Sequence, residues 1–492
     1  MTENYRRDRV EEILGKEIPE EFRGILALIH LVDYRMVDAV DDCNFACRSM
    51  FRFDTLMGKK ASTRAIAAVL SPVIWCLSKF KNRKVPKADP RLVFSSTFLL
   101  SARYPAAREV IEKDTGCTAV LTFTDMLKLE GKNQQLNLKA SLKPEKHARK
   151  PVYFPGQTVT GGELAKAVVT YCETVYGAHS TKDPETIRAA LRTLEAAYQA
   201  RVRKIEKCLR KDRDCALYMT INQYNLRDLL IIHACKNLGI RTMEQGHFAA
   251  QFSWMPYSEE NKMDRLCFAG EYGFWNEMEK RFQELVYACA SPLYKPEELR
   301  FFISGNPEIS REQAEMLRAR YKPERKLTFM LFAHQNRELV GIEDKYVAWR
   351  WGVFKALKEL KEKQNLIINI RYTPYKEMEY REKEEPTLKE WGFTVSESVP
   401  SNLMEDLLTS VAIMSSTSSV MSTARLFGKL VYRVENYLYP YVHVDDNIHE
   451  VKISEIPDIV IPEGIEETLP EIDFDGIFDV NRIKWITGTR FR

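Results

Sequence analysis

The sequence predicts an α/β protein with two doubly wound lobes that follow an N-terminal helical extension. From about residue 91 onward, short apolar runs alternate with amphipathic helical patterns, which is typical of βαβ units on a parallel sheet. The alternation forms two separate sets, divided by a charged helical stretch at 310–326. A length of 492 residues suggests about three domains. Two lobes and an extension account for that length.

The composition excludes several classes of protein. Hydrophobic residues make up 45% and charged residues 29% of the chain, an ordinary balance for a globular protein. The net charge is only +4, so we expect no nucleic-acid partner. Ten cysteines are scattered without a CxxC pair or a zinc-binding spacing, which favours buried, reduced thiols in a cytoplasmic protein.

Residues 1–90 are expected to form an N-terminal helical region of mixed charge. The first 22 residues are charged throughout, which is not the pattern of a secretory signal. The stretch 65–80 is fairly apolar, but it is too short to span a bilayer and contains Pro72. A helix buried in its own domain is the favoured interpretation. The basic segment that follows leaves peripheral association with the inner face of a membrane as the alternative.

The N-terminal lobe is expected at 91–315. Its predicted strands share short apolar runs, at 91–100, 117–124, 215–221, 240–246, 264–270 and 299–307. Its predicted helices are 106–116, 183–212 and 226–239, the last closed by Gly239. The polar, Pro/Gly-rich stretch 130–162 is expected to lie on the surface.

The C-terminal lobe is expected at 316–460, and a tail at 461–492 is expected to pack back on the N-terminal lobe. The predicted strands of this lobe are 326–334, 365–374, 393–398, 411–416 and 429–434. The predicted helices are 346–363, 402–410 and 419–428.

Hydroxyl side chains fill the junction between the strand at 411–416 and the helix that follows it. Ser415, Ser416, Ser418 and Ser419 flank Thr417 there. A helix start offers unpaired N–H groups to a phosphate, and hydroxyls add neutral donors. Ligands of open α/β sheets bind at the carboxyl ends of strands, where these serines fall. A single serine would suffice as a helix cap, so the run of hydroxyls favours anion binding over capping alone.

A second cluster, "EQGH", follows the strand predicted at 240–246. Glu244, Gln245 and His247 surround Gly246, which permits a tight turn. A carboxylate and an imidazole three residues apart could supply a general base and its orienting partner. The alternative for His247 is a structural hydrogen-bonding role.

A third group of polar residues follows two strands of the C-terminal lobe. His334 begins the run "HQNR", and Arg371 and Lys376 flank the strand that ends at Pro374. These cations and donors would suit the charge of a diphosphate, although each could also be an ordinary polar junction.

Several cofactor and metal signatures are absent from the sequence. No GxGxxG follows the strand at 91–100, and no GxxxxGK[ST] occurs, which argues against a dinucleotide oxidoreductase and a P-loop nucleotidase. "DRD" at 212–214 and "DFD" at 473–475 match a DxD metal signature only in spelling, since they fall at a helix end and in an acidic tail. We therefore expect no metal and no cofactor.

Five segments occur in an order that resembles a known family. They are "NQYNLRDLLIIHACKNLGIRTMEQGHF", "DRLCFAGEYGFWNE", "FFISGNP", "LTFMLFAHQNR" and "IMSSTSSVMSTARLFGKLVYRV". Over roughly 215–435 the chain resembles the GT-B glycosyltransferases of bacterial surface polysaccharides. That group includes the CDP-glycerol glycerophosphotransferases and the capsule sialyl- and Kdo-transferases. The resemblance implies two Rossmann-like lobes (GT-B), with the nucleotide sugar mainly against the C-terminal lobe.

The resemblance also implies roles for individual residues. The four serines at 415–419 would hold the donor phosphates, and Glu244 or His247 in "EQGH" would act as the base. Thr373 occupies the place of the histidine in the His-Pro motif of many relatives, so His334 or Arg371 would donate to the leaving phosphate instead. Ala424 and Arg425 stand where the family carries an acidic residue.

The sequence as a whole predicts a metal-independent glycosyltransferase. It would use a CMP-, CDP- or UDP-linked sugar as substrate and act on a glycan or lipid-linked acceptor. Two alternatives remain open at this point. One is a nucleotide-sugar epimerase of the same architecture, and the other is a non-catalytic carbohydrate-assembly protein with a degenerate site. The sequence does not determine the oligomeric state.

Overall fold

The fold is taken from a computed structural model that describes most of the chain after residue 163 and parts of the chain before it. Apart from shorter pieces, the described residues are 91–95, 118–123, 152–153, 163–177, 183–210, 215–220, 226–246, 269–277, 299–331, 343–373, 377–397, 402–416, 420–435, 448–464 and 472–479. The predicted helix at 106–116 and the apolar stretch 65–80 lie outside them.

The N-terminal lobe is built on one parallel sheet. Its strands are β1 (Arg91–Ser95), β2 (Thr118–Phe123), β3 (Val152–Tyr153), β4 (Cys215–Thr220), β5 (Arg241–Gln245), β6 (Glu271–Phe274) and β7 (Arg300–Ile303). They lie in the order β3-β2-β1-β4-β5-β6-β7, and every pair is parallel. This is the order of a doubly wound Rossmann sheet with one strand added at the β6 edge.

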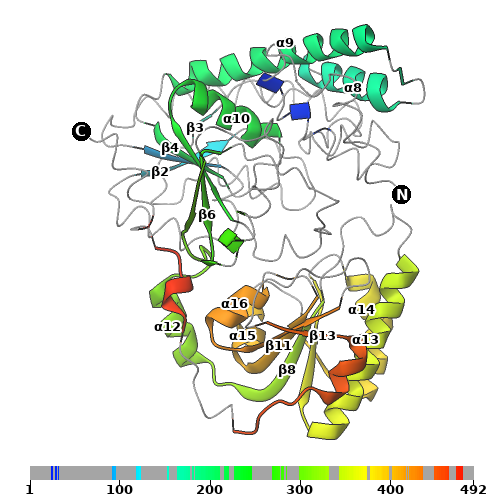
Figure 1. Cartoon of the computed structure of the whole chain (residues 1–492). Helices are drawn as coiled ribbons and strands as arrows, with labels where there is room; N and C mark the ends of the chain where they lie inside the picture. Colours follow the sequence, from blue (N-terminus) through cyan, green and yellow to red (C-terminus); the bar gives the residue numbers. More distant parts are fainter. Residues whose placement is uncertain are drawn as a thin grey trace, which may run out of the picture.

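Helices α8 (Glu163–Tyr176), α9 (Pro184–Leu209) and α10 (Leu226–Asn237) cover this lobe. In α9 an apolar stripe at helical spacing is buried, comprising Ile187, Leu191, Leu194, Tyr198, Val202 and Ile205. Figure 1 shows α8 and α9 lying along each other at the outer end of the lobe. Four residues of the N-terminal region join the same core: Ile25, Leu28, Ile29 and Val32. Gly239 closes α10 with a φ of 65°, as predicted.

The C-terminal lobe repeats the same strand order in a second parallel sheet. Its strands are β8 (Glu324–Met330), β9 (Ile367–Arg371), β10 (Thr394–Val395), β11 (Ser410–Ser415), β12 (Leu430–Val434) and β13 (His449–Val451). The order is β10-β9-β8-β11-β12-β13, all parallel. Counted from β8, this is again 3-2-1-4-5-6. The predicted fold class, α/β with two Rossmann-like lobes, is confirmed.

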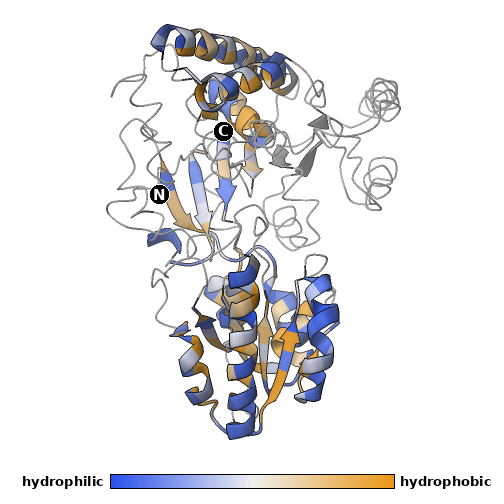
Figure 2. Cartoon of the chain, turned by 90° about the vertical axis from the view of Figure 1, so that its right-hand side faces the viewer, coloured by the Kyte–Doolittle hydropathy of each residue, from blue (hydrophilic) through white to orange (hydrophobic). Residues whose placement is uncertain are grey.

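Helices cover both faces of the second sheet (Figure 1). The helices α13 (Glu343–Gln364) and α14 (Met378–Glu390) pack on one face, and α12 (Arg311–Arg320), α15 (Leu403–Leu408) and α16 (Val420–Leu426) pack on the other. Adjacent β11 residues divide between the two cores, with Ala412 in one and Ile413 in the other. Figure 2 shows apolar residues concentrated on the inner strands and polar residues on the outer faces of the helices.

One predicted strand is misplaced, and several elements were not predicted. The run predicted as a strand at 264–270 precedes the strand that the structure shows, which is β6 at Glu271–Phe274. The prediction missed β3, α8, α14 and β13 altogether. The strand β3 lies in the stretch 130–162 that was expected on the surface, and it pairs with β2 at the edge of the sheet. In the predicted tail, residues 472–479 include a 3-10 turn, Phe474–Gly476, and contact both lobes.

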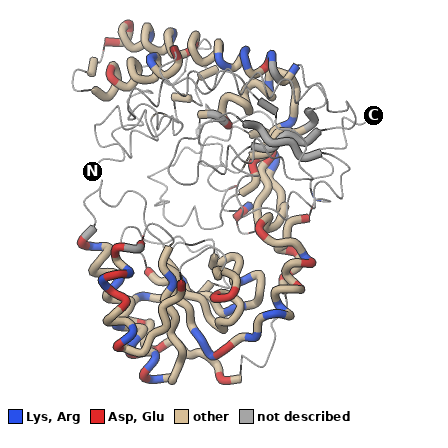
Figure 3. Tube along the Cα trace, turned by 180° about the vertical axis from the view of Figure 1, so that it is seen from behind, with Lys and Arg blue, Asp and Glu red and all other residues tan. Residues whose placement is uncertain are grey.

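Charges of both signs are interspersed along α13 and α14, which agrees with the small net charge (Figure 3). Among the described helices, none combines the length and the apolar character that crossing a bilayer requires. The described residues also contain no group of three or more His, Cys, Asp or Glu side chains that could hold a metal ion. Cys172 and Cys235 are buried.

Candidate functional site

The hydroxyl run at 415–419 begins where β11 ends. All six residues of β11 are buried, because β8 and β12 pair with it on either side and helices cover both faces of the sheet. The chain winds outward from β8 in one direction through β9 and β10, and in the other through β11 to β13, so the sheet switches direction between β8 and β11. Ligands of doubly wound sheets bind outside the carboxyl ends of the strands at such a point. The serines therefore follow a strand of the switch point.

Ser415 and Ser416 are both buried, with 0% and 3% of their surface exposed. The Ser415 hydroxyl donates to the backbone carbonyl of Met330, at 2.8 Å, and so joins the ends of β11 and β8. Its proton is therefore used within the sheet. This hydrogen bond gives Ser415 a structural role at the end of β11.

Ser418 is half-buried and caps α16. Its hydroxyl accepts from the Val420 backbone N–H at 3.3 Å, and its carbonyl accepts from Met421 N–H at 3.1 Å. The hydroxyl proton remains for a ligand when the oxygen accepts in this way. Because α16 has only seven residues, its macrodipole adds little, and hydroxyls are the main donors here. Thr417 and Ser419 lie outside the described residues.

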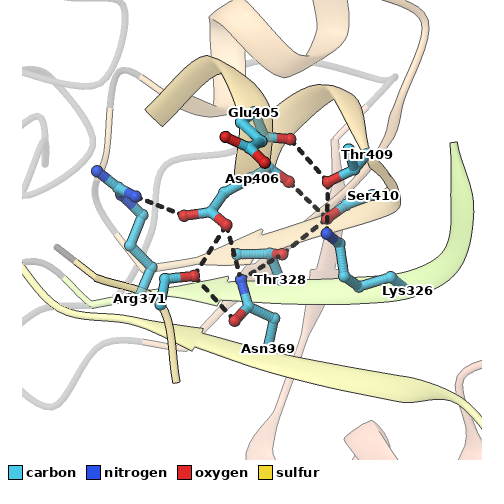
Figure 4. Close-up of polar contacts among 9 residues, drawn as sticks. Lys326, Thr328, Asn369, Arg371, Glu405, Asp406, Thr409 and Ser410 are labelled. Carbon is cyan, nitrogen blue, oxygen red and sulfur yellow. Dashed lines mark hydrogen bonds and ion pairs between the residues drawn. The ribbon is translucent and has the colours of Figure 1, made fainter. Parts of the chain in front are cut away.

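Arg371, at the end of β9, has a carboxylate partner. It is 4% exposed and forms an ion pair with Asp406 of α15. Asp406 also accepts from Ser396 Oγ at 2.8 Å and from Asn369 Nδ2 at 3.3 Å (Figure 4). The charge of Arg371 is thus balanced within the protein. In the predicted role at a phosphate, Arg371 would bind while still paired with Asp406, and would not bring an uncompensated positive charge.

Thr373 joins the ends of two central strands. Its hydroxyl donates to the Leu331 carbonyl at 2.6 Å, while Leu331 N–H donates to the Arg371 carbonyl at 2.9 Å. Ser415 reaches the adjacent carbonyl of Met330 from the other side of β8. The structure therefore brings Thr373, Arg371 and Ser415 to the same end of the sheet. His334, predicted to lie with them, is outside the described residues, as is Lys376.

The second predicted cluster lies at the end of β5 in the N-terminal lobe. Glu244 is half-buried and is aligned with Thr220 of β4 and Tyr272 of β6. Gln245 is buried; its side chain donates to the Gly305 carbonyl at 3.3 Å and accepts from Ser304 Oγ at 2.7 Å. His247 lies outside the described residues. The turn that precedes it is thus fixed to the end of β7.

The ends of β7 and β11 are connected across the two lobes. Asn306, three residues after β7, is 2% exposed, and its Nδ2 donates to Thr423 Oγ1 of α16 at 3.5 Å. The Thr423 hydroxyl donates to Glu308 Oε2 at 3.4 Å. The helix that follows the serine run therefore contacts the lobe that carries Glu244.

Sequence reasoning missed several polar residues of this region. Ser304 and Asn306 were visible as "SGNP" at the end of a predicted strand, a signal that would have supported a site prediction. Asp406 and Glu279 gave no such signal, because they lie within helical patterns and reach their partners only after packing.

No protein-family model matches the chain, and no curated protein matches it. One similar solved structure is the UDP-GlcNAc 2-epimerase from Neisseria meningitidis bound to UDP-GlcNAc, with a TM-score of 0.45 and 9% identity, covering 81% of this chain and 98% of that chain.

Two further similar structures are Acinetobacter baumannii MurG and the wall teichoic acid polymerase TagF. For MurG the TM-score is 0.35, the identity is 11%, and the match covers 81% of this chain and 94% of that chain. For TagF the TM-score is 0.34, the identity is 11%, and the match covers 78% of each chain. The two-lobed architecture is established independently of these similarities by the strand orders of the two sheets.

Proposed function

We propose that the protein is a GT-B-type glycosyltransferase that uses a nucleotide-activated sugar to build a bacterial surface glycan. The donor would be CMP-, CDP- or UDP-linked, and the acceptor would be a glycan or a lipid-linked glycan. One observation carries the proposal: a run of hydroxyl residues follows β11 at the switch point of the second Rossmann-like sheet. Resemblance of the ordered segments over 215–435 supports the same choice.

The proposed reaction is a displacement at the anomeric carbon of the donor. Glu244 or His247 takes the proton from an acceptor hydroxyl, and the resulting oxygen forms the new bond to carbon. The bond from that carbon to the nucleotide phosphate breaks, and the nucleotide leaves with the electron pair. A positioned base contributes about 10²–10⁴-fold. The same residues would serve a displacement at phosphorus if the donor is of the CDP-glycerol type.

Charge on the departing nucleotide would be stabilised by hydrogen-bond donors of the C-terminal lobe. Ser418 and Ser419 supply hydroxyls beside the start of α16. Donors that are fixed before the reaction stabilise developing charge without reorganisation. Arg371 is paired with Asp406, so it would contribute less positive potential than an unpaired arginine. Hydroxyl and backbone donors, with no metal, would therefore carry this step.

Nucleotide binding tests the proposal directly. CMP, CDP and UDP should be titrated into the protein while the melting temperature is recorded, since a ligand at 100 times its Kd stabilises the folded state by about 2.7 kcal/mol. We expect one of them to bind, and Ser418→Ala combined with Ser419→Ala to abolish that binding. Ser410→Ala is the matched control, because it removes a buried hydroxyl at the opposite end of β11. Unchanged affinity in the double variant would refute the assignment.

A second measurement separates a transferase from the two alternatives. CMP-N-acetylneuraminic acid, CDP-glycerol and UDP-N-acetylglucosamine should each be supplied without an acceptor. An epimerase would invert or release the sugar in that mixture, whereas a transferase needs the acceptor. Binding of none of the three nucleotides would favour the alternative of a non-catalytic assembly protein. In a transferase, His247→Ala should stop turnover while nucleotide affinity is kept.

A further inference from the structure

Glu279 is a buried carboxyl that the proposed reaction does not use. It lies five residues after β6 and is 2% exposed. Its Oε2 accepts from the Trp275 backbone N–H at 2.8 Å, and its own N–H donates to Asn276 Oδ1 at 3.0 Å. Its Oε1 is buried and has no hydrogen-bond partner among the described residues. Burying an unpaired carboxyl oxygen costs free energy, which indicates that this side chain has a role in the fold or in the site.

Trp275 connects Glu279 to the turn at the end of β5. The Trp275 side chain is 2% exposed, and its indole Nε1–H donates to the Gly246 carbonyl at 2.5 Å. The Gly246 N–H donates to the Gly273 carbonyl at 2.7 Å. Both backbone groups of Gly246 are therefore bound to the end of β6, directly before His247 in the chain.

The Glu279 carboxyl also lies against this turn. A Cβ added to Gly246 would lie 3.1 Å from the Gly273 carbonyl oxygen and 3.6 Å from Glu279 Oε2. There is little room for movement between these groups. Gln245, one residue earlier, is tied to Ser304 and Gly305 of the next strand end. The turn is thus held by β6 on one side and by β7 beyond it.

We propose that Glu279 is a positioning residue: it fixes Trp275, and the Trp275 indole holds the Gly246 carbonyl and thereby the described part of the turn, residues 244–246. This inference rests on the proposed function, in which the turn at 244–247 carries the base that deprotonates the acceptor. A base misplaced by about 1 Å can lose about 10²-fold in rate. The neutral form of a carboxyl, or an amide in its place, can accept from Trp275 N–H, but an alkyl side chain cannot.

Four variants test the proposal kinetically. Glu279→Leu removes the acceptor for the Trp275 backbone N–H, and Glu279→Gln keeps it. Trp275→Phe removes the indole donor together with part of the ring volume. Trp349→Phe is the matched control, since its indole donates in the same way to the Glu435 carbonyl at 2.6 Å in the other lobe. Nucleotide release should be measured with CMP-N-acetylneuraminic acid, CDP-glycerol or UDP-N-acetylglucosamine, whichever is turned over with an acceptor.

Glu279→Leu and Trp275→Phe should each lower kcat about tenfold or more, with the Kd for the free nucleotide within about twofold of wild type. Glu279→Gln should restore most of kcat, and Trp349→Phe should leave it unchanged. Full kcat in Trp275→Phe, or a loss equal to that of Trp349→Phe, would overturn the proposal. So would a weakened nucleotide affinity of the same size as the loss in kcat.

An activity-independent readout keeps this test separate from that of the proposed function. Hydrogen exchange of the Trp275 indole N–H can be followed by NMR in protein labelled with ¹⁵N-tryptophan. Exchange of the indole N–H should be about tenfold faster in Glu279→Leu, which loses the hydrogen bond to the Trp275 backbone N–H. It should be unchanged in Glu279→Gln, which keeps that bond. An unaltered rate in Glu279→Leu would overturn the positioning role, even if none of the three nucleotides binds.

Discussion

Glu279 and Arg371 illustrate two ways in which this protein buries an ionisable side chain. Arg371 is 4% exposed and keeps its charge beside Asp406. Glu279 is 2% exposed, and its desolvation raises the pKa of the carboxyl to about 8, against the opposing effect of the Trp275 N–H. A carboxyl with that pKa carries its proton at pH 7. The buried group beside Gly246 is therefore neutral under ordinary conditions.

Glu279→Gln should make folding less sensitive to pH. The pKa of Glu279 is about 8 in the folded protein and 4.5 as its ordinary value. Between these values the folded state binds more protons than the unfolded state, so stability is full below pH 4.5 and is lost as pH rises towards 8. The free energy of unfolding of wild type relative to the variant should fall by about 1.4 kcal/mol per pH unit.

Urea unfolding at pH 5, 6, 7 and 8 measures this difference. The exposed Glu185→Gln provides a control, because that side chain is 71% exposed. A difference for Glu279→Gln that stays flat across the four pH values would contradict the assignment of a neutral carboxyl.

At the level of single residues, the sequence indicated which residues lie at strand ends better than what each residue contacts. The serines and "EQGH" could be found because each directly follows an apolar strand pattern. The ion pair of Arg371 could not, since Asp406 lies on α15 and reaches β9 only after the helix packs on the sheet. Likewise, the contact between the Ser415 hydroxyl and Met330 depends on the pairing of β11 with β8.

A buried ion cluster joins the elements α13 and α14. Arg350 of α13 has no exposed surface and forms ion pairs with Glu377 and Glu384. Tyr346 donates to Glu377 Oε1 at 2.8 Å, and Tyr372 donates to Glu384 Oε2 at 2.9 Å. Glu377 precedes the first residue of α14. The cluster therefore fixes the point where the chain, having left β9, enters the next helix.

Arg350→Met should destabilise the protein strongly. Removal of one partner leaves two buried carboxylates without their cation, which typically costs about 3–5 kcal/mol. Glu377→Gln and Glu384→Gln added to Arg350→Met should recover much of that loss. Arg188→Met is the control, because the side chains of Arg188 and Glu185 are 38% and 71% exposed and such pairs contribute about 0–1 kcal/mol. Chemical unfolding measures the free energy of unfolding of each variant. A loss below about 1 kcal/mol for Arg350→Met would refute the prediction.

Most elements after residue 183 could be predicted from hydrophobic periodicity, and the misses have physical reasons. The strand β6 contains Glu271, whose burial is offset by an ion pair with Arg241, so its sequence lacks an apolar run. The helix α14 is highly charged and contains Pro386. Its charge and its proline both weaken the helical pattern in the sequence. In each case a contact between elements compensates for a weak local signal.

On the scale of the whole molecule, one segment fastens the two lobes together. Asp473 N–H donates to the Leu426 carbonyl of the C-terminal lobe at 2.9 Å. Four residues later, Ile477 pairs with Asn306 in a parallel bridge, and Phe478 N–H donates to the Asn306 carbonyl at 3.0 Å. Residues 472–479 thus hold the end of β7 against the helix that follows the serines.

Gly305→Ala should disrupt this junction. Gly305 has a φ of +85°, and an added Cβ would lie 2.1 Å from the Ile477 carbonyl oxygen. Gly464→Ala is a matched control, since Gly464 has a φ of +75° with no atom within 4 Å of its Cβ position. The control should lose only the cost of a left-handed alanine, about 1–2 kcal/mol, whereas Gly305→Ala must also displace the chain at 477.

Urea unfolding and limited proteolysis around 472–479 report on the two variants. Gly305→Ala should lose more stability than Gly464→Ala and be cleaved faster in this segment. Equal stability and equal cleavage in the two variants would show that the contact with Ile477 does not hold the lobes.

The Asn306–Ile477 bridge also bears on the order of events during biosynthesis. Ile477 is translated only after the entire second sheet, and domains generally fold as units in the order in which they emerge. The nascent chain would therefore contain two separately formed halves before the bond at Asn306 can be made. The alignment of the two lobes would be completed late, and a ribosome that stalled before residue 472 would leave the halves without this bridge.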